Sequence, residues 1–144
     1  SGRKKGEEEL NEVIREIHIK AEPETIFAYF TDAEKLVEWM GVEATLEPHT
    51  GGRFQVTINQ ERKVMGEYLE LTPYSRVVVS WGWEGRDDVP PSSSTVEITL
   101  LPNAEGTLVR LRHYNLPETA MPLHVKSWEH NLPRLKKALE QSAT

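Results

Sequence analysis

Alternation of apolar and polar residues with a period of two dominates the middle of the chain. In RVVVSWGWEG this period sets two valines and two tryptophans on one strand face: Val77, Val79, Trp81 and Trp83. Six further segments alternate similarly or are rich in β-branched residues, and turn residues bound them: 11–20, 42–48, 53–58, 64–73, 95–102 and 107–114. The pattern predicts seven strands in an antiparallel sheet with one apolar and one solvated face.

Three other segments have helical spacing. Pro23 suits the first turn of a helix formed by PETIFAYF. TDAE at 31–34 matches a capping box that starts at Thr31, which predicts a second short helix to about Trp39. Between about 122 and 141, four apolar residues recur on one helical face: Trp128, Leu132, Leu135 and Leu139.

This order of elements predicts an α+β domain over residues 10–144. Only the last helix is large enough to cover the apolar face of the sheet, so the sheet should curl around it. Trp81 and Trp83 would then face Trp128. Pro133 inside the last helix predicts a kink, because proline lacks the N–H that would bond the carbonyl of Glu129.

Composition narrows the possible partners. The 144 residues contain no cysteine and carry 17 basic against 23 acidic side chains, a net charge of -6. The absence of cysteine excludes disulfides and thiolate chemistry, while the acidic stretch 22–47 disfavours nucleic acid and anionic membranes. No bilayer-length apolar run or signal peptide is visible, so we expect a cytoplasmic protein without membrane insertion. Residues 1–9 are polar and lack apolar periodicity, which predicts a mobile tail. Its Ser-Gly start is typical of an expression-vector remnant.

Several side chains are candidates for chemistry. The inward aromatic residues either line a pocket or simply fill the core: Phe54, Tyr68, Trp81, Trp83 and Trp128. His113 shares the inward face with Leu111, where it could orient a ligand or act as a base, although a satisfied structural histidine is the commoner case. Tyr68 shares a face with Glu70 by alternation, unless a bulge reverses the assignment.

Other catalytic patterns are missing from the sequence. Glu67 and Glu70 have opposite parity on their strand, so they do not form an acid–base pair. Neither a G-x-S-x-G elbow nor a phosphate-binding loop occurs, and no cofactor is expected. The five histidines lack metal-ligand spacing: His18, His49, His113, His124 and His130. Nothing in the sequence requires an enzyme.

The ordered segments PETIFAYFTDAEKLVEWM, GGRF, GEYLELTPYSRVVVSW, STVEITLLPNAEGTLVRLRH and WEHNLPRLKKAL resemble START-like, helix-grip proteins. Within that superfamily the chain is similar, over about residues 12–141, to homologues of the activator of the 90-kDa heat-shock protein's ATPase. The resemblance implies a curved seven-stranded sheet gripping a C-terminal helix, with a hydrophobic cavity between them. Two features depart from the family pattern: Ser127 stands where glycine is common, and the loop 86–94 is rich in proline and serine.

Three functions follow as hypotheses. The first is binding of a small hydrophobic or aromatic molecule, lipids included, by inward residues: Phe54, Val56, Tyr68, Val79, Trp81, Trp83, Ile98, Leu111, His113, Trp128 and Leu132. The second, from the resemblance, is a chaperone cofactor in a stress response that uses its outer surface, for example 22–47. The third is a cyclase or hydratase that uses His113. We expect a monomer or weak dimer.

Overall fold

The computed structural model describes residues 10–142, in which seven strands form one antiparallel sheet of order β1-β7-β6-β5-β4-β3-β2. The predicted tail, residues 1–9, lies outside the described residues. The strands are β1 (Leu10–Ile19), β2 (Glu43–Leu46), β3 (Arg53–Thr57), β4 (Lys63–Thr72), β5 (Arg76–Trp81), β6 (Ser94–Asn103) and β7 (Gly106–Pro117). All seven predicted strands are confirmed, with boundaries that differ by a few residues.

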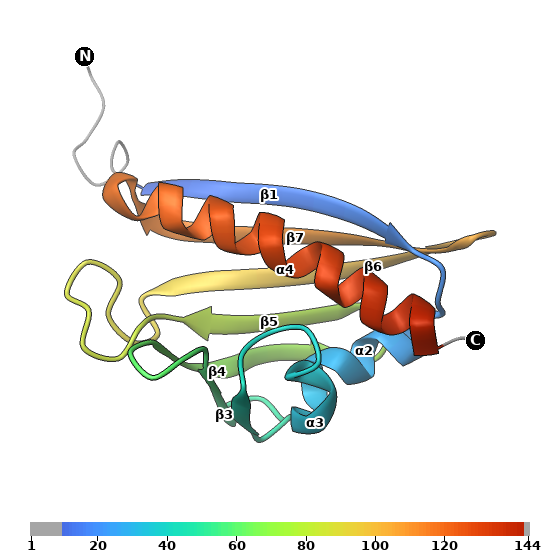
Figure 1. Cartoon of the computed structure of the whole chain (residues 1–144), viewed down its shortest axis with the longest axis horizontal. Helices are drawn as coiled ribbons and strands as arrows, with labels where there is room; N and C mark the ends of the chain where they lie inside the picture. The colour runs from blue at the N-terminus through green and yellow to red at the C-terminus, as the bar shows by residue number, and fades with distance from the viewer. Residues whose placement is uncertain (1–9, 143–144) are drawn as a thin grey trace, which may run out of the picture.

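The helices lie on one side of the sheet (Figure 1). Helix α2 (Pro23–Thr31) and the single-turn helix α3 (Ala33–Leu36) follow β1. A 3-10 turn, η1 (Glu118–Ala120), leads from β7 into the long helix α4 (Met121–Ser142). Figure 1 shows α4 running along the sheet, with α2 and α3 beside its C-terminal half. The predicted α+β architecture, a curved antiparallel sheet around a C-terminal helix, is confirmed.

Between α4 and the sheet lies the apolar core. The inward residues of β5, β6 and β7 are buried as the alternation predicts: Val77, Val79, Trp81, Val96, Ile98, Leu100, Val109, Leu111 and His113. From the opposite side, α4 buries its predicted stripe of Trp128, Leu132, Leu135 and Leu139. The apolar stripe of α4 lies against the inward residues of the sheet. Burial of these apolar side chains is the main contribution to the free energy of folding.

The opposite face of the sheet carries charged residues in cross-strand pairs. Its ion pairs are Glu12–Arg112, Glu16–Arg110, Arg76–Glu97 and Arg76–Glu70. Exposed pairs of this kind contribute little stability each. Their role is to keep this face solvated, as the sequence predicts.

Two local details of the helix–strand region differ from the sequence prediction. The cap of α3 is Asp32, whose carboxylate accepts from the backbone N–H of the next turn, whereas the Thr31 hydroxyl donates to the Phe27 carbonyl. Val42, the first residue of the predicted strand 42–48, precedes β2 and is 70% exposed. The hydroxyl of Thr31 finds its nearest acceptor one turn back in α2, which leaves capping to the aspartate.

A β-bulge in β4 decides the direction of two side chains. Tyr68 pairs with Val79 but Glu70 pairs with Val78, so the register shifts by one residue between them. Tyr68 is therefore buried in the core, while Glu70 bonds Arg76 on the charged face. The simple alternation that put both on one face is wrong, for the reason that bulges reverse parity. The parity argument about Glu67 and Glu70 fails for the same reason.

The proline- and serine-rich loop after β5 packs against the end of the sheet. A Cβ added at Gly82 would lie 1.8 Å from the carbonyl oxygen of Pro90, so the two backbones touch there. Val89 of this loop is fully buried, and Ser92 bonds Ser80 through their hydroxyls at 3.0 Å. The predicted loop is confirmed, and its contacts fix it to the strand.

Candidate functional site

Aromatic rings meet where β5 faces α4. We call the set Phe54, Tyr68, Trp81, Trp83, His113, His124 and Trp128 the aromatic cluster. Trp81 lies at its centre, with ring centroids 5.2 Å from Trp128, 5.5 Å from His113 and 5.9 Å from Trp83. The sequence-predicted residues without aromatic rings are buried in the same core: Val56, Val79, Ile98, Leu111 and Leu132. The structure thus brings all eleven predicted residues into one core.

His113 has both ring nitrogens engaged. The indole N–H of Trp128 can only donate, and it lies 3.0 Å from Nδ1 of His113, so this nitrogen carries no proton. Nε2 therefore holds the proton and donates to Oγ of Ser94 at 2.8 Å. The Ser94 hydroxyl in turn donates a hydrogen bond to the carbonyl of Trp81 at 2.7 Å. Since His113 donates this hydrogen bond to Ser94, its Nε2 does not act as a base toward that hydroxyl.

His124 on α4 has the opposite tautomer. Its Nδ1 lies 2.7 Å from the carbonyl of Ala120, an acceptor, so Nδ1 carries the proton. Its Nε2 then accepts from the indole N–H of Trp83 at 3.0 Å. The rings of His113 and His124 stand edge to face with centroids 4.9 Å apart. Two neutral imidazoles thereby join two tryptophans across the sheet–helix interface.

Burial keeps both imidazoles neutral. Desolvation holds the pKa of His113 well below its usual value, and the neighbouring His124 adds to the effect. Desolvation also lowers the pKa of His124. The hydrogen bond to the Ala120 carbonyl opposes this shift, whereas the positive charges of Arg86 and Arg62 add to it. A second proton on either ring would sit on the nitrogen that now accepts a hydrogen bond from an indole N–H. Two donors would then face each other, and the added charge would lie unpaired in the core.

Tyr68 connects the sheet to α2. Its hydroxyl donates to the carbonyl of Phe30 at 2.7 Å, and burial raises its pKa, so the phenol stays neutral. Its ring meets Phe54 edge to face at 5.6 Å. The hydroxyl is thus committed to the end of α2 in this conformation.

Two small cavities flank Trp81. One of about 10 Å³ is lined by apolar and aromatic side chains, among them Phe30 and Ile98. The other, of about 30 Å³, is lined by Met40, Ile58, Arg62, Trp81, Trp83, His124, Ser127, Trp128 and Asn131. Pockets that enclose drug-sized ligands measure roughly 300–1,000 Å³, whereas about 30 Å³ suits one water molecule. Side chains therefore fill most of the space between sheet and helix.

Two residues that line the larger cavity each carry a buried donor without a protein acceptor among residues 10–142. These donors are Nε1 of Trp81 and Nε of Arg62. The guanidinium carbon of Arg62 lies 4.9 Å from the ring centroid of Trp83, which holds the side chain in place by a cation–π contact. Ser127 and Asn131 supply further polar groups from α4.

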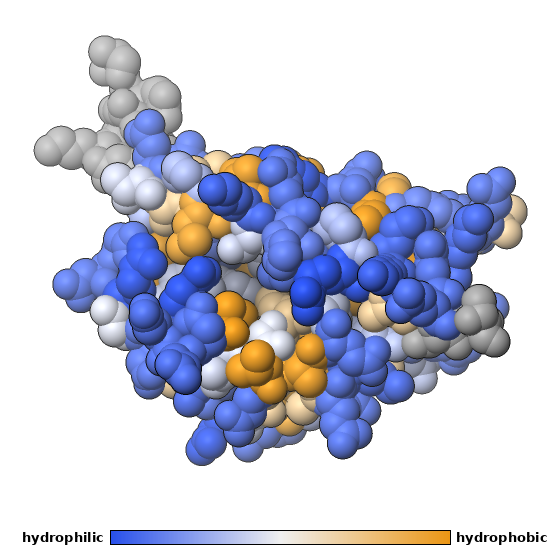
Figure 2. Space-filling view, viewed as in Figure 1, coloured by the Kyte–Doolittle hydropathy of each residue, from blue (hydrophilic) through white to orange (hydrophobic). Residues whose placement is uncertain are grey.

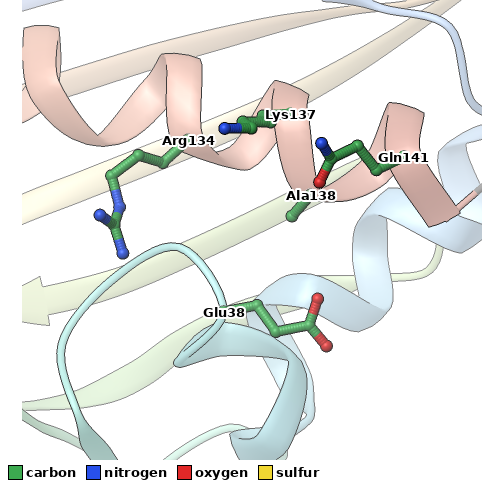
Figure 3. A pocket seen from close by; sticks show the side chains of 5 residues that line it. All are labelled: Glu38, Arg134, Lys137, Ala138 and Gln141. Atoms are coloured by element: carbon green, nitrogen blue, oxygen red, sulfur yellow. The ribbon is translucent and has the colours of Figure 1, made fainter.

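A surface groove runs along the seam between α4 and the turn after α3. It measures about 560 Å³ and is lined by Glu38, Arg134, Lys137, Ala138 and Gln141 (Figure 3). In Figure 3 Arg134 reaches across the seam toward this turn, where its Nε donates to the carbonyl of Trp39 at 3.2 Å. Figure 2 shows the same face as mainly hydrophilic, with smaller hydrophobic patches between the charged side chains.

Sequence reasoning missed three residues of this site. His124 lies four residues before Trp128 and so extends the apolar stripe of α4, which was the available signal. Ser94 and Arg62 had no signal, because one ends a polar loop and the other lies in the β3–β4 turn. Within residues 10–142 no group of three or more histidine or carboxylate side chains could hold a metal ion. None of the described helices has the length and apolar character to cross a bilayer.

Comparison with known proteins gives one family. The model of the family described as "Activator of Hsp90 ATPase homolog 1-like protein" matches residues 20–140. The solution structure of an AHSA1-like protein from Rhizobium etli is 42% identical, with a TM-score of 0.72 over 91% of this chain and 83% of that one. The Aha1 dimer of Colwellia psychrerythraea is 26% identical, with a TM-score of 0.77 over 90% and 96%.

A crystal structure from Mesorhizobium loti is similar in fold, at 21% identity and a TM-score of 0.82 over 91% of this chain and 98% of that one. No curated protein sequence matches the chain.

Proposed function

Because the chain belongs to the family of Activator of Hsp90 ATPase homolog 1-like proteins, we propose that it binds a small, mostly apolar molecule between its sheet and α4. The ligand would lie against the aromatic cluster, at the position of the two cavities beside Trp81. Aromatic side chains offer large contact areas to flat apolar molecules at little cost in conformational entropy.

One observation carries this proposal: the indole N–H of Trp81 is buried without a protein acceptor among the described residues. A buried donor without an acceptor costs about 1–3 kcal/mol. The other three tryptophans place theirs on acceptors, namely Tyr29, His124 and His113. A ligand oxygen beside Trp81 would complete the pattern and recover that free energy.

Binding requires the two cavities to open and merge. Met40, Trp81 and Trp128 line both of them. Met40 has an unbranched, flexible side chain that adapts easily, and it follows directly after Trp39, whose carbonyl takes the hydrogen bond from Arg134. Movement of this turn away from α4 would break that bond and lead from the groove into the core.

Titration with 2-naphthamide, a neutral aromatic probe with a carbonyl oxygen, tests the proposal. We expect saturable binding by calorimetry and a shift of the Trp81 indole N–H resonance in a ¹H–¹⁵N spectrum. Trp81→Phe removes this donor and should weaken binding at least fivefold. Trp39→Phe is the comparison: this residue also lines the smaller cavity, but its N–H already donates to the Tyr29 carbonyl at 3.1 Å, so the change removes ring area without removing a free donor and should weaken binding less.

Native mass spectrometry of freshly purified protein provides an independent test of the same proposal. A bound small molecule would support it. The absence of any bound molecule, together with an unchanged Trp81 resonance across a panel of apolar probes, would contradict it. In that case the donor of Trp81 meets only a water molecule.

A second candidate, a protein-binding module of the chaperone-cofactor type, is favoured by the family and by one surface. The stretch 22–47 exposes seven carboxylates against a single lysine: Glu22, Glu24, Asp32, Glu34, Glu38, Glu43 and Glu47. A basic partner surface would bind there with an affinity that falls steeply with salt. Recovery of a purified chaperone on the immobilised protein, lost after Glu24→Lys and Glu34→Lys together, would support this role.

A further inference from the structure

We infer that the interior site selects ligands that carry a carboxylate, with Arg62 as the counter-ion. This inference rests on the proposed function and adds the chemical class of the ligand. It concerns the larger cavity, which Arg62, Trp81, Ser127 and Asn131 help to line.

Arg62 is the exception among the arginines of residues 10–142. Six of them pair with carboxylates: Arg15, Arg53, Arg76, Arg86, Arg110 and Arg112. Arg134 donates to the Trp39 carbonyl. The guanidinium of Arg62 has neither kind of partner in the described part of the chain, and its Nε is buried. A partly buried cation without an ionic partner is costly, and a bound anion would reduce that cost.

The position of Arg62 is fixed before any ligand arrives. Its guanidinium lies over the ring of Trp83, whose own N–H is held by His124. A guanidinium is planar and presents its donors as a fork, which matches the two oxygens of a carboxylate better than a single carbonyl oxygen. Preorganisation of this kind lowers the entropic cost of binding.

The remaining polar lining agrees with an anionic group. Trp81 offers a donor only, and Ser127 and Asn131 can both donate. No aspartate or glutamate lines this cavity, although the chain as a whole has a net charge of -6. Arg86, the other cation whose charge lowers the pKa of His124, is committed to Asp88 at 2.7 Å. Arg62 is therefore the cationic side chain among the residues that line this cavity.

Comparison of 2-naphthoate with 2-naphthamide at pH 7 tests the inference. The two probes share ring and size and differ in charge. We expect the wild-type protein to bind 2-naphthoate at least tenfold more tightly, with a larger downfield shift of the Trp81 indole proton. Arg62→Gln should reduce the preference to within twofold, and Arg62→Lys should retain part of it.

Arg53→Gln is the matched control, because it removes one positive charge from the neighbouring strand at a side chain 64% exposed and outside the cavity. It should leave the preference unchanged. Circular dichroism confirms that each variant is folded.

The outcomes separate the two proposals. If both probes bind equally, or the preference survives Arg62→Gln, the carboxylate inference is overturned while interior binding stands. The same holds if native mass spectrometry finds a neutral molecule bound. If neither probe binds and no molecule co-purifies, the proposed function fails, and the inference fails with it.

Discussion

The indole N–H of Trp128 on α4 donates to Nδ1 of His113 on β7 at 3.0 Å, in the middle of an apolar core. This bond gives the sheet–helix interface a direction that hydrophobic contact alone lacks, since hydrogen bonds require alignment. Trp83 and His124 repeat the arrangement from the other side, with the tryptophan on the sheet side and the histidine on the helix. The two reciprocal bonds fix the position of α4 along its axis.

Loss of this bond should be measurable as coupling. His113→Leu and Trp128→Phe each leave a buried polar group unpaired, and we expect each to lower the free energy of unfolding by about 2–4 kcal/mol. The double variant should lose less than the sum, with a coupling energy of about 1–2 kcal/mol. Urea unfolding of the four proteins measures it. Strict additivity would show that the bond contributes no stability of its own.

Stability should fall as the pH drops below about 6.5. Burial lowers the pKa of His113 and of His124 in the folded state. Just below pH 6.5, the ordinary pKa of histidine, these two side chains therefore take up protons more readily in the unfolded chain than in the folded protein. Each histidine then costs at most about 1.4 kcal/mol per pH unit. The stability is fully present above that pH and declines between about pH 6.5 and 5, before the carboxylates begin to titrate.

Urea unfolding at half-unit intervals from pH 5 to 7.5 tests this dependence. His124→Phe should reduce the slope in that window, because it removes one of the two groups whose pKa is lowered on folding. An unchanged slope would mean that the proton uptake belongs to other side chains.

Pro133 should cost α4 stability. The helix continues through this residue, which is exposed and lacks the N–H that would bond the carbonyl of Glu129. Pro133→Ala restores that donor, and we expect a gain of about 1–3 kcal/mol, given a difference of about 3 kcal/mol in helix propensity. Lys137→Ala, at another exposed site of α4, is the control and should change stability little. A loss with Pro133→Ala would show that the predicted kink is needed to fit α4 onto the curved sheet.

The contact between β5 and the following loop should tolerate no side chain. A methyl group at Gly82 would lie 1.8 Å from the Pro90 carbonyl oxygen, a backbone atom that cannot rotate away. Gly82→Ala is therefore expected to destabilise the protein by about 3 kcal/mol or more. Gly85→Ala meets no neighbouring atom and should cost only about 1 kcal/mol, through its positive φ of 78°. Thermal unfolding of the two variants compares them, and equal losses would place the loop farther from the strand.

The sequence predicts the fold well because periodicity reports which way a side chain faces. Val109, Leu111 and His113 are buried as alternation requires. Periodicity fails where one extra residue is inserted, as in the bulge between Tyr68 and Glu70. The bulge leaves no mark in the residue types, since both parities of β4 contain residues that suit either face.

The candidate site is predictable only as a list of inward residues. Facing inward does not determine whether side chains leave a cavity, because that depends on packing at the scale of a methyl group. The tautomers of His113 and His124 likewise follow from which donor or acceptor lies nearest to each nitrogen. The contribution of Arg62 to the cavity could be recognised only in the three-dimensional structure, because its cation–π contact with Trp83 brings together residues 21 positions apart.

The pairing of the first strand with the last has a consequence for synthesis of the protein. Among residues 10–142, the one strand that pairs with β1 is β7, where Val13 pairs with His113 and Ile19 with Thr107, and α4 then covers both. A nascent chain on the ribosome must therefore hold β1 without a partner until some hundred further residues have been translated. Contacts so distant in sequence slow folding, and during that interval the apolar side of β1 is available to any chaperone that meets it.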